Sequence, residues 1–213
     1  MKCAPAVAIR RERLPARAIK RYSARRGRVK EMAINALGEN SVEGTRLDRQ
    51  LGNFSITDAE IARVTSSRVD ELLKYFEQKT GGKRLPCRAD VSPRDLKKYL
   101  PELFLFQILY DADGGIEDLM VQLMGTTVAN FYGEITGQTV REGAPSPEVT
   151  ERILIACRRM LASGGPVVAE VSSLSEEKNH LRVQVLYVPM SEDGTLIDRI
   201  CGYAHVSLRS AAE

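Results

Sequence analysis

The feature that most restricts the fold is the order in which the apolar residues change their spacing along the chain. Two runs typical of strands, LFLFQILY and IEDLMVQLM, are separated only by the turn residues DADGG, which indicates an antiparallel hairpin. Helical segments follow, and three more strands are expected in PVVAEVSSL, HLRVQVLYVPM and RICGYAHVSL. Because a parallel sheet would alternate strands with helices, this order predicts an α+β fold, with a five-stranded antiparallel sheet and helices across one face.

An amphipathic helix is expected before this sheet, from Asp58 to Gln78. Its apolar residues recur at three- and four-residue spacing, and Gly81-Gly82 follows as a stop signal. The apolar stripe needs a surface to cover it. That surface is either the sheet of the same chain or the same helix of a second copy, and the dimer or partner contact would use Ile61, Val64, Leu72, Leu73 and Phe76.

Two further helices have clear end signals. Ser92 is a good N-cap residue, so a short helix is predicted from Pro93 to Tyr99, and Pro101 blocks its extension. A longer helix should span Pro147 to Ser163 and end at Gly164.

Alternation along two strands assigns their faces. In IEDLMVQLM, Leu119, Val121 and Leu123 should share one face, with Met120, Gln122 and Met124 on the other. In RICGYAHVSL, His205 shares a face with Cys201, Tyr203 and Ser207. This set suits an outer face or a dimer contact better than a metal site, because one thiol and one imidazole do not complete a coordination sphere.

The net charge of +3 conceals an uneven distribution, because residues 1–30 contain 11 Lys and Arg but only one acid, Glu12. Clustered basic residues can contact nucleic acid or an anionic membrane. This segment has a single aromatic residue, Tyr22, and two prolines that interrupt a helix, so a disordered arm is the preferred interpretation. Residues 1–55 are therefore predicted to be a basic extension and linker, residues 56–82 a helix, and residues 83–209 the main domain.

Several chemical classes find no support in the sequence. The four cysteines form no CxxC pair, which fits a reducing cytoplasm, and no apolar run is long enough to cross a bilayer. No phosphate loop, GxGxxG or GxSxG string occurs. The two histidines are His180, in a charged turn, and His205, while Cys157 falls in an apolar helical stripe. We therefore expect no catalytic site.

Four strings carry a resemblance to a known family: LPCRADVSPRDLKKYLP, LMGTTVANFYGEITGQTV, GGPV and YVPMSEDGTLIDRICG. They resemble the LPxRxDxxPxxLxxYLP, GTxVxxxxGxxxTG and PxxxDGxxIDxIxG patterns of a bacterial family of mostly single-domain PAS proteins, over residues 85–208. The first string would lead the chain into the first strand, with Arg88 and Asp90 as a surface pair. The sequence departs from the family at Gln122 and Met124, where an arginine is more usual.

The resemblance implies a sensor or adaptor in bacterial signal transduction, which binds a small ligand or a partner between the sheet and the helices. The Asn-Cys-Arg string of flavin-binding relatives is absent, no haem-ligand signature is evident, and the cofactor is left unknown. Candidate cavity residues are Val128, Phe131, Ile155, Val185, Tyr187 and Ala204, with Tyr187 as the polar group, although these residues could also pack as solid core.

Expected partners are a second copy of the chain, a sensor kinase or other signalling protein, and an unknown small ligand. The alternative function is that of a nucleic-acid-associated regulatory protein, and it depends on residues 1–30 alone.

Overall fold

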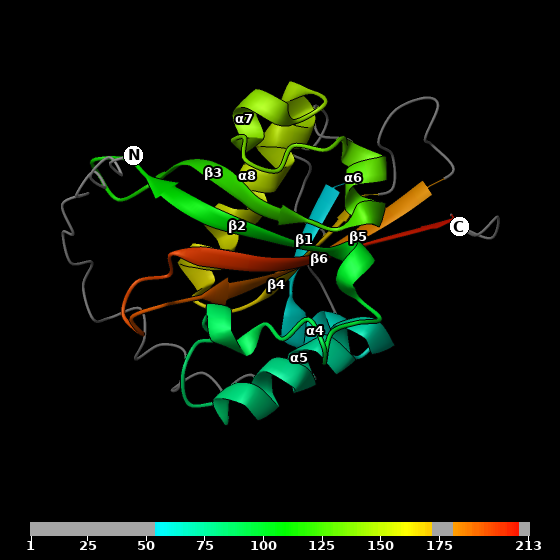
Figure 1. Ribbon diagram of the computed structural model, residues 1–213, viewed down its shortest axis with the longest axis vertical. Coiled ribbons are helices and arrows are strands. Elements are labelled where there is room, and N and C mark those ends of the chain that lie inside the picture. Colours follow the sequence, from blue (N-terminus) through cyan, green and yellow to red (C-terminus); the bar gives the residue numbers. More distant parts are fainter. Residues whose placement is uncertain (1–53, 172–180, 209–213) are drawn as a thin grey trace, which may run out of the picture.

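The centre of the molecule is a six-stranded antiparallel sheet with the strand order β1-β4-β5-β6-β2-β3 (Figure 1). The computed structural model describes residues 54–171 and 181–208. The strands are β1 (Phe54–Asp58), β2 (Leu103–Tyr110), β3 (Ile116–Met124), β4 (Val167–Val171), β5 (Leu181–Met190) and β6 (Arg199–Leu208). The antiparallel arrangement is confirmed, but the predicted number of five strands is wrong.

The additional strand is β1, which pairs with β4 from Phe54↔Val171 to Asp58↔Val167. Its sequence, FSITD, falls at the end of the predicted linker and the start of the predicted helix. Phe54 and Ile56 pack against a core cluster of the sheet. The strand is short, and it extends the sheet through pairing with a segment more than one hundred residues away, which no local pattern indicates.

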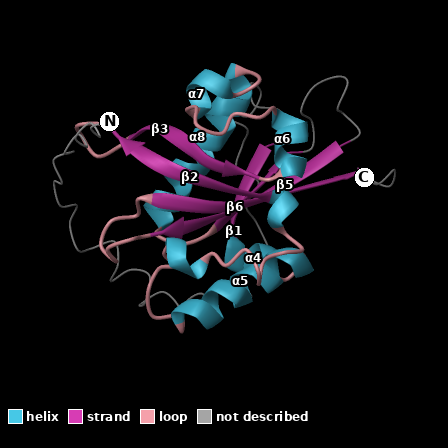
Figure 2. Ribbon diagram, in the orientation of Figure 1, coloured by secondary structure: helices cyan, strands magenta, loops and turns pink. Residues whose placement is uncertain are grey.

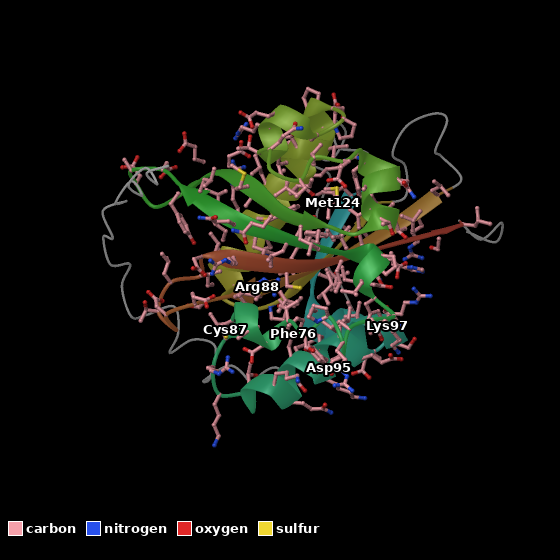
Figure 3. The ribbon with its side chains drawn as sticks, viewed as in Figure 1. Phe76, Cys87, Arg88, Asp95, Lys97 and Met124 are labelled. Atoms are coloured by element: carbon pink, nitrogen blue, oxygen red, sulfur yellow. The ribbon has the colours of Figure 1, made fainter. Side chains whose placement is uncertain are left out.

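Helices cover both faces of the sheet rather than one (Figures 1 and 2). One face carries α6 (Thr126–Tyr132), α7 (Val140–Gly143) and α8 (Pro147–Ser163), and the other carries α4 (Ala59–Ala62) and α5 (Ser67–Thr80). Two separate apolar clusters lie under these layers, and we call them the α8-side core and the α5-side core. Met124 and Phe76 lie on opposite sides of the sheet in Figure 3.

The helix predicted from Asp58 to Gln78 is divided in two. After α4, the chain turns, and α5 starts anew with Ser66 as N-cap, whose Oγ accepts a hydrogen bond from the backbone N–H of Val69 at 3.5 Å. The second helix ends where expected, because Gly81 adopts the left-handed conformation at φ 62°.

The segment from Pro93 to Tyr99 forms consecutive turns instead of the predicted helix. The Ser92 hydroxyl accepts the bond from the N–H of Asp95 at 3.4 Å, as a cap would. The Asp95 carboxylate, however, accepts a bond from Lys79 of α5 at 2.8 Å. Short 3-10 helices precede and follow this segment, η1 (Arg88–Asp90) and η2 (Leu100–Glu102). The lead-in as a whole runs along the α5 side of the sheet, where Cys87, Arg88, Asp95 and Lys97 are seen in Figure 3.

A bulge in β3 changes the predicted faces of its last residues. The register shifts between Leu105 and Phe106, so Leu105 faces Leu123 while Phe106 faces Val121. Val121 is buried in the α8-side core, and Leu123 is 38% exposed. Met124 packs against the α8-side core, so the prediction for Leu123 and Met124 is wrong because an extra residue inverts the alternation.

Candidate ligand cavity

A small apolar cavity of about 30 Å³ lies in the α8-side core, between the sheet and the layer formed by α6, α7 and α8. The sheet contributes residues of β2, β3, β5 and β6, and the covering layer contributes residues of α6, α7, α8 and the loops between them. The lining is Phe104, Phe106, Met124, Val128, Tyr132, Ile135, Val140, Ala144, Pro145, Val149, Ile153, Val185, Tyr187 and Ala204. A water needs roughly 10–15 Å³, so this space holds about two waters and a larger ligand needs the covering layer to move.

Four of the six predicted cavity residues line this space, namely Val128, Val185, Tyr187 and Ala204. Phe131 lies beside it, where its ring packs against the Tyr132 ring with the centroids 4.8 Å apart. Ile155 is half-buried and belongs to neither core cluster. Ile155 therefore lies away from the cavity that its neighbour on α8, Ile153, helps to line.

Two aromatic residues of the cavity floor, Phe104 and Phe106, were not among the predicted cavity residues. The rings of Phe104 and Phe106 lie 4.5 Å apart, and the Phe104 ring meets the Tyr187 ring edge-on at 5.8 Å. Alternation along β2 places Phe104 and Phe106 on the same face, so the sequence does indicate that the two rings lie side by side. Which face of β2 lies under α8 depends on pairing between β2 and β6, a long-range contact.

Two tyrosine side chains supply the polar groups at the cavity. Burial raises the pKa of Tyr132 to about 12, and burial raises the pKa of Tyr187 well above its ordinary value, with smaller contributions from Cys157 and Tyr132. Among the residues that the structure describes, neither phenol hydroxyl has a hydrogen-bond partner. A buried tyrosine hydroxyl usually has one, so both hydroxyls are available for a bound molecule.

Two other side chains near the cavity differ in what they can do. Cys157 is fully buried, and burial raises the pKa of its thiol, so the thiol stays protonated and is a poor nucleophile or metal ligand. Arg152 is only 8% exposed, in the first half of α8. Burial lowers the pKa of Arg152, and the neighbouring Tyr132 and Glu148 act in the opposite direction.

A polar cluster lies on the other face of the sheet and joins α5, η2 and β6. Arg68 Nη1 is 3.2 Å from Glu102 Oε2 and donates to the Tyr203 hydroxyl at 2.8 Å. The Tyr203 hydroxyl donates to Glu102 Oε2 at 2.8 Å, and His205 Nδ1 lies 3.0 Å from Glu102 Oε1. We call these four residues the Arg68 cluster. Two residues close to this cluster in the sequence line the cavity on the opposite face. Phe104 follows Glu102 by two positions, and Ala204 lies between Tyr203 and His205.

His205 therefore faces α5 and lies away from the cavity, on a face that α5 partly covers. In residues 54–171 and 181–208, no group of three or more His, Cys, Asp or Glu side chains is arranged to hold a metal ion. His180 lies outside the described residues, as does the basic arm of residues 1–30. No helix in the described part of the chain is long and apolar enough to cross a membrane.

The residues predicted for a dimer or partner contact divide into two groups. Leu72, Leu73 and Phe76 are at most 5% exposed, because they pack in the α5-side core of their own chain. Ile61 and Val64 are 44% and 83% exposed, at the end of α4 and in the turn that follows.

In the segment LPCRADVSPRDLKKYLP, which leads into β2, Asp90 has a structural role. Asp90 accepts bonds from both terminal nitrogens of Arg84, at 2.6 and 2.9 Å, and from the backbone N–H of Cys87 at 2.8 Å. The predicted pair of Arg88 and Asp90 is therefore wrong, because Arg88 bonds the carbonyl of Val91 instead. The Arg84 bonds are the main reason why the pKa of Asp90 is lowered to about 2.

Comparison with known proteins gives the class of the molecule. A family model described as PAS domain matches residues 64–205, which is about two thirds of the chain. The chain therefore belongs to the PAS-domain family, a class of signal-sensing modules. No curated protein and no solved structure matches it.

Proposed function

We propose that this chain is a non-catalytic sensor or adaptor of bacterial signal transduction, which binds a small ligand in the α8-side cavity. The observation that supports this function best is the cavity itself: an apolar space in a PAS domain with two tyrosine hydroxyls that make no bond to the described protein. Apolar pockets with a few polar groups are the usual form of small-molecule sites.

The Arg68 cluster supports a route for the signal. Phe104 of β2 and Ala204 of β6 line the cavity, while Glu102, at the end of η2 just before β2, and Tyr203 of β6 bond Arg68 of α5. A ligand that moves β2 or β6 changes the geometry of these bonds. The position of α5 then reports occupancy to a signalling partner such as a sensor kinase.

A cavity-filling substitution tests ligand binding. Wild-type protein is incubated with a small-metabolite extract and examined by non-denaturing mass spectrometry, where a bound small molecule is expected. Ala204→Leu fills the cavity and should abolish the adduct. The control Ala162→Leu, at an exposed position of α8, should keep it. A wild-type protein without adduct, or an adduct that survives Ala204→Leu, would refute the sensor function.

The exposed pair Ile61 and Val64 supports a homodimer contact at the turn between α4 and α5. Val64→Lys should lower the dimer fraction in size-exclusion chromatography with light scattering, because it places a charge in an apolar contact. Leu208→Lys is the control, since Leu208 is similarly exposed, at 77%, at the end of β6. Equal behaviour of the two variants and the wild type would contradict this contact.

A further inference from the structure

Two tyrosine hydroxyls determine which hydrogen bonds the cavity can offer to a ligand. Tyr187 is 4% exposed, and Tyr132 is the last residue of α6. Both side chains line the same small space, and their hydroxyls make no hydrogen bond to any residue that the structure describes. Each phenol hydroxyl is therefore left with a donor to satisfy, and two such donors at one cavity suit a group that accepts two hydrogen bonds.

The lining of the cavity carries no charge to balance that of an ion. Within residues 54–171 and 181–208, no acidic or basic side chain lines the cavity, and Arg152 of α8 lies outside the lining. Burial raises the pKa of both tyrosines, so their hydroxyls stay neutral at neutral pH. An ion loses its hydration on entering such a space and gains no counter-charge from the lining. A neutral ligand is therefore favoured over both an anion and a cation.

A neutral ligand that brings donors of its own is less well matched to this lining. In the described part of the chain, the lining side chains offer only weak acceptors apart from the oxygens of Tyr132 and Tyr187. The hydroxyl of an alcohol or the N–H of an amide would depend on these same two oxygens. A ketone, an aldehyde or an ester has no O–H or N–H, and its carbonyl oxygen has two lone pairs, one for each tyrosine.

We propose, on the basis of the proposed sensor function, that the ligand is a neutral, mainly apolar molecule with a carbonyl oxygen, of the ketone, aldehyde or ester type. The carbonyl oxygen accepts hydrogen bonds from Tyr132 and Tyr187, and the adjoining carbons lie against Phe104 and Phe106. The carbonyl group and its first carbons are the part that a cavity of about 30 Å³ can hold. The rest of the molecule extends toward Pro145, the exposed residue of the lining.

Titration of the full chain with 2-hexanone, hexanoate and hexylammonium tests the assignment, because these probes have similar lengths but differ in charge. The shifts of the backbone amide signals in NMR spectra give the affinity of each probe. 2-Hexanone should bind about tenfold more tightly than either ion, since only the ions lose strong hydration on entering the cavity.

Tyrosine variants test the two hydrogen bonds. Tyr132→Phe and Tyr187→Phe remove only the hydroxyls and should each weaken the binding of 2-hexanone about three- to tenfold. Their melting temperatures should not fall, because neither hydroxyl bonds a residue that the structure describes. Tyr75→Phe is the matched control, since the Tyr75 hydroxyl donates to the carbonyl of Asp90 at 2.6 Å on the α5 side of the sheet. This variant should bind 2-hexanone as the wild type does.

The carbonyl ligand and the sensor function can fail separately. The carbonyl assignment is overturned if 2-hexanone does not bind the wild type, if either ion binds as tightly, or if its affinity is unchanged in both Tyr132→Phe and Tyr187→Phe. A metabolite adduct that is lost in Ala204→Leu would then still support the sensor function. If no such adduct is found either, both proposals fail.

Discussion

At the scale of single residues, Gly202 shows how closely the cavity floor is packed. A Cβ atom at this position would lie 1.8 Å from Cζ of Phe104, so only glycine lets the phenyl ring lie across β6. Phe104 and Tyr187 are the residues paired with Gly202 on the neighbouring strands, and both line the cavity. The absence of one side chain therefore determines the position of two aromatic rings.

We predict that Gly202→Ala displaces the Phe104 ring and lowers the free energy of unfolding by about 1–3 kcal/mol, as overpacking of a core does. Ligand binding in the cavity should weaken in parallel. Urea denaturation measures the first effect and calorimetry the second. Gly165→Ala is the matched control, because a Cβ there has no atom within 4 Å. A Gly202→Ala protein as stable as this control would show that the ring has room to move.

A second residue-scale prediction concerns Asp90, whose side chain is 11% exposed beside Arg84. Its pKa is about 2 in the folded protein, below the ordinary value of 3.8, chiefly because Arg84 bonds the carboxylate. A lowered folded pKa stabilises the protein above the unfolded pKa, and this contribution is lost as the pH falls from about 4 to 2. We expect it to be about 1–2 kcal/mol, since the exposed Arg84 is screened by water.

Asp90→Asn should therefore destabilise the protein at pH 7 and reduce the loss of stability between pH 4 and pH 2. Urea denaturation at a series of pH values measures both effects. Asp95→Asn provides the comparison, since Asp95 and its partner Lys79 are both well exposed. Identical acid profiles for wild type and Asp90→Asn would show that another carboxylate dominates this range.

At the scale of elements, the Arg68 cluster links α5 to η2 and to β6, one of the two central strands of the sheet. Arg68 is half exposed, with 48% of its side chain accessible, whereas Glu102 is 17% accessible and bonds three of the cluster's groups. His205 Nδ1 lies near both Arg68 and Glu102, but it can serve only one of these bonds at a time, because the atom carries either a proton or a lone pair. Glu102 is therefore the central residue of the cluster.

We predict that Glu102→Gln lowers the free energy of unfolding by about 1 kcal/mol, because it weakens a partly buried ion pair and the bond to Tyr203. Amide hydrogen exchange should increase selectively in the first turn of α5, which begins one residue before Arg68. Glu71→Gln is the control, since Glu71 is an exposed acid of α5 that bonds Lys98. Uniform exchange along α5 in the Glu102→Gln protein would argue against a local link.

The elements that were predicted well are those whose signals are local. The helix from Pro147 to Ser163 has the predicted bounds because Ser146 caps it and Gly164, at φ 66°, ends it. The strands β2 to β6 were expected from their β-branched and aromatic residues. The errors arose where tertiary contacts decide: β1 forms through pairing with β4, and the bulge in β3 inverts Leu123 and Met124.

At the scale of the whole molecule, the sheet is shared by two apolar cores, one on each face. Sequence periodicity gave the antiparallel sheet, yet it placed the helices on one side because an amphipathic stripe does not show what covers it. For the same reason, the stripe that holds Leu72 and Phe76 was left between the sheet of the same chain and a dimer contact, and these two residues pack in the α5-side core. Three of the predicted cavity residues that line the cavity, Val185, Tyr187 and Ala204, lie on strands, where alternation assigns the faces, while the bonds of the Arg68 cluster on the other face were not visible in the sequence.

Because one sheet separates the two cores, a change in the cavity should reach α5 through β6. In this strand Ala204 faces the cavity, and its neighbours Tyr203 and His205 point to the other face, where they belong to the Arg68 cluster. We predict that Ala204→Leu, which fills the cavity, changes the amide exchange of α5 several-fold as well as that of α6 and α8. The double variant Arg68→Gln/Ala204→Leu is compared with Arg68→Gln alone. The added exchange of α5 should largely disappear in this comparison, because the bonds from η2 and β6 to α5 are already broken. Hydrogen exchange followed by mass spectrometry measures the response of each helix. If Ala204→Leu changes exchange only in α6 and α8, or if the change in α5 persists without Arg68, the sheet does not transmit cavity occupancy by this route.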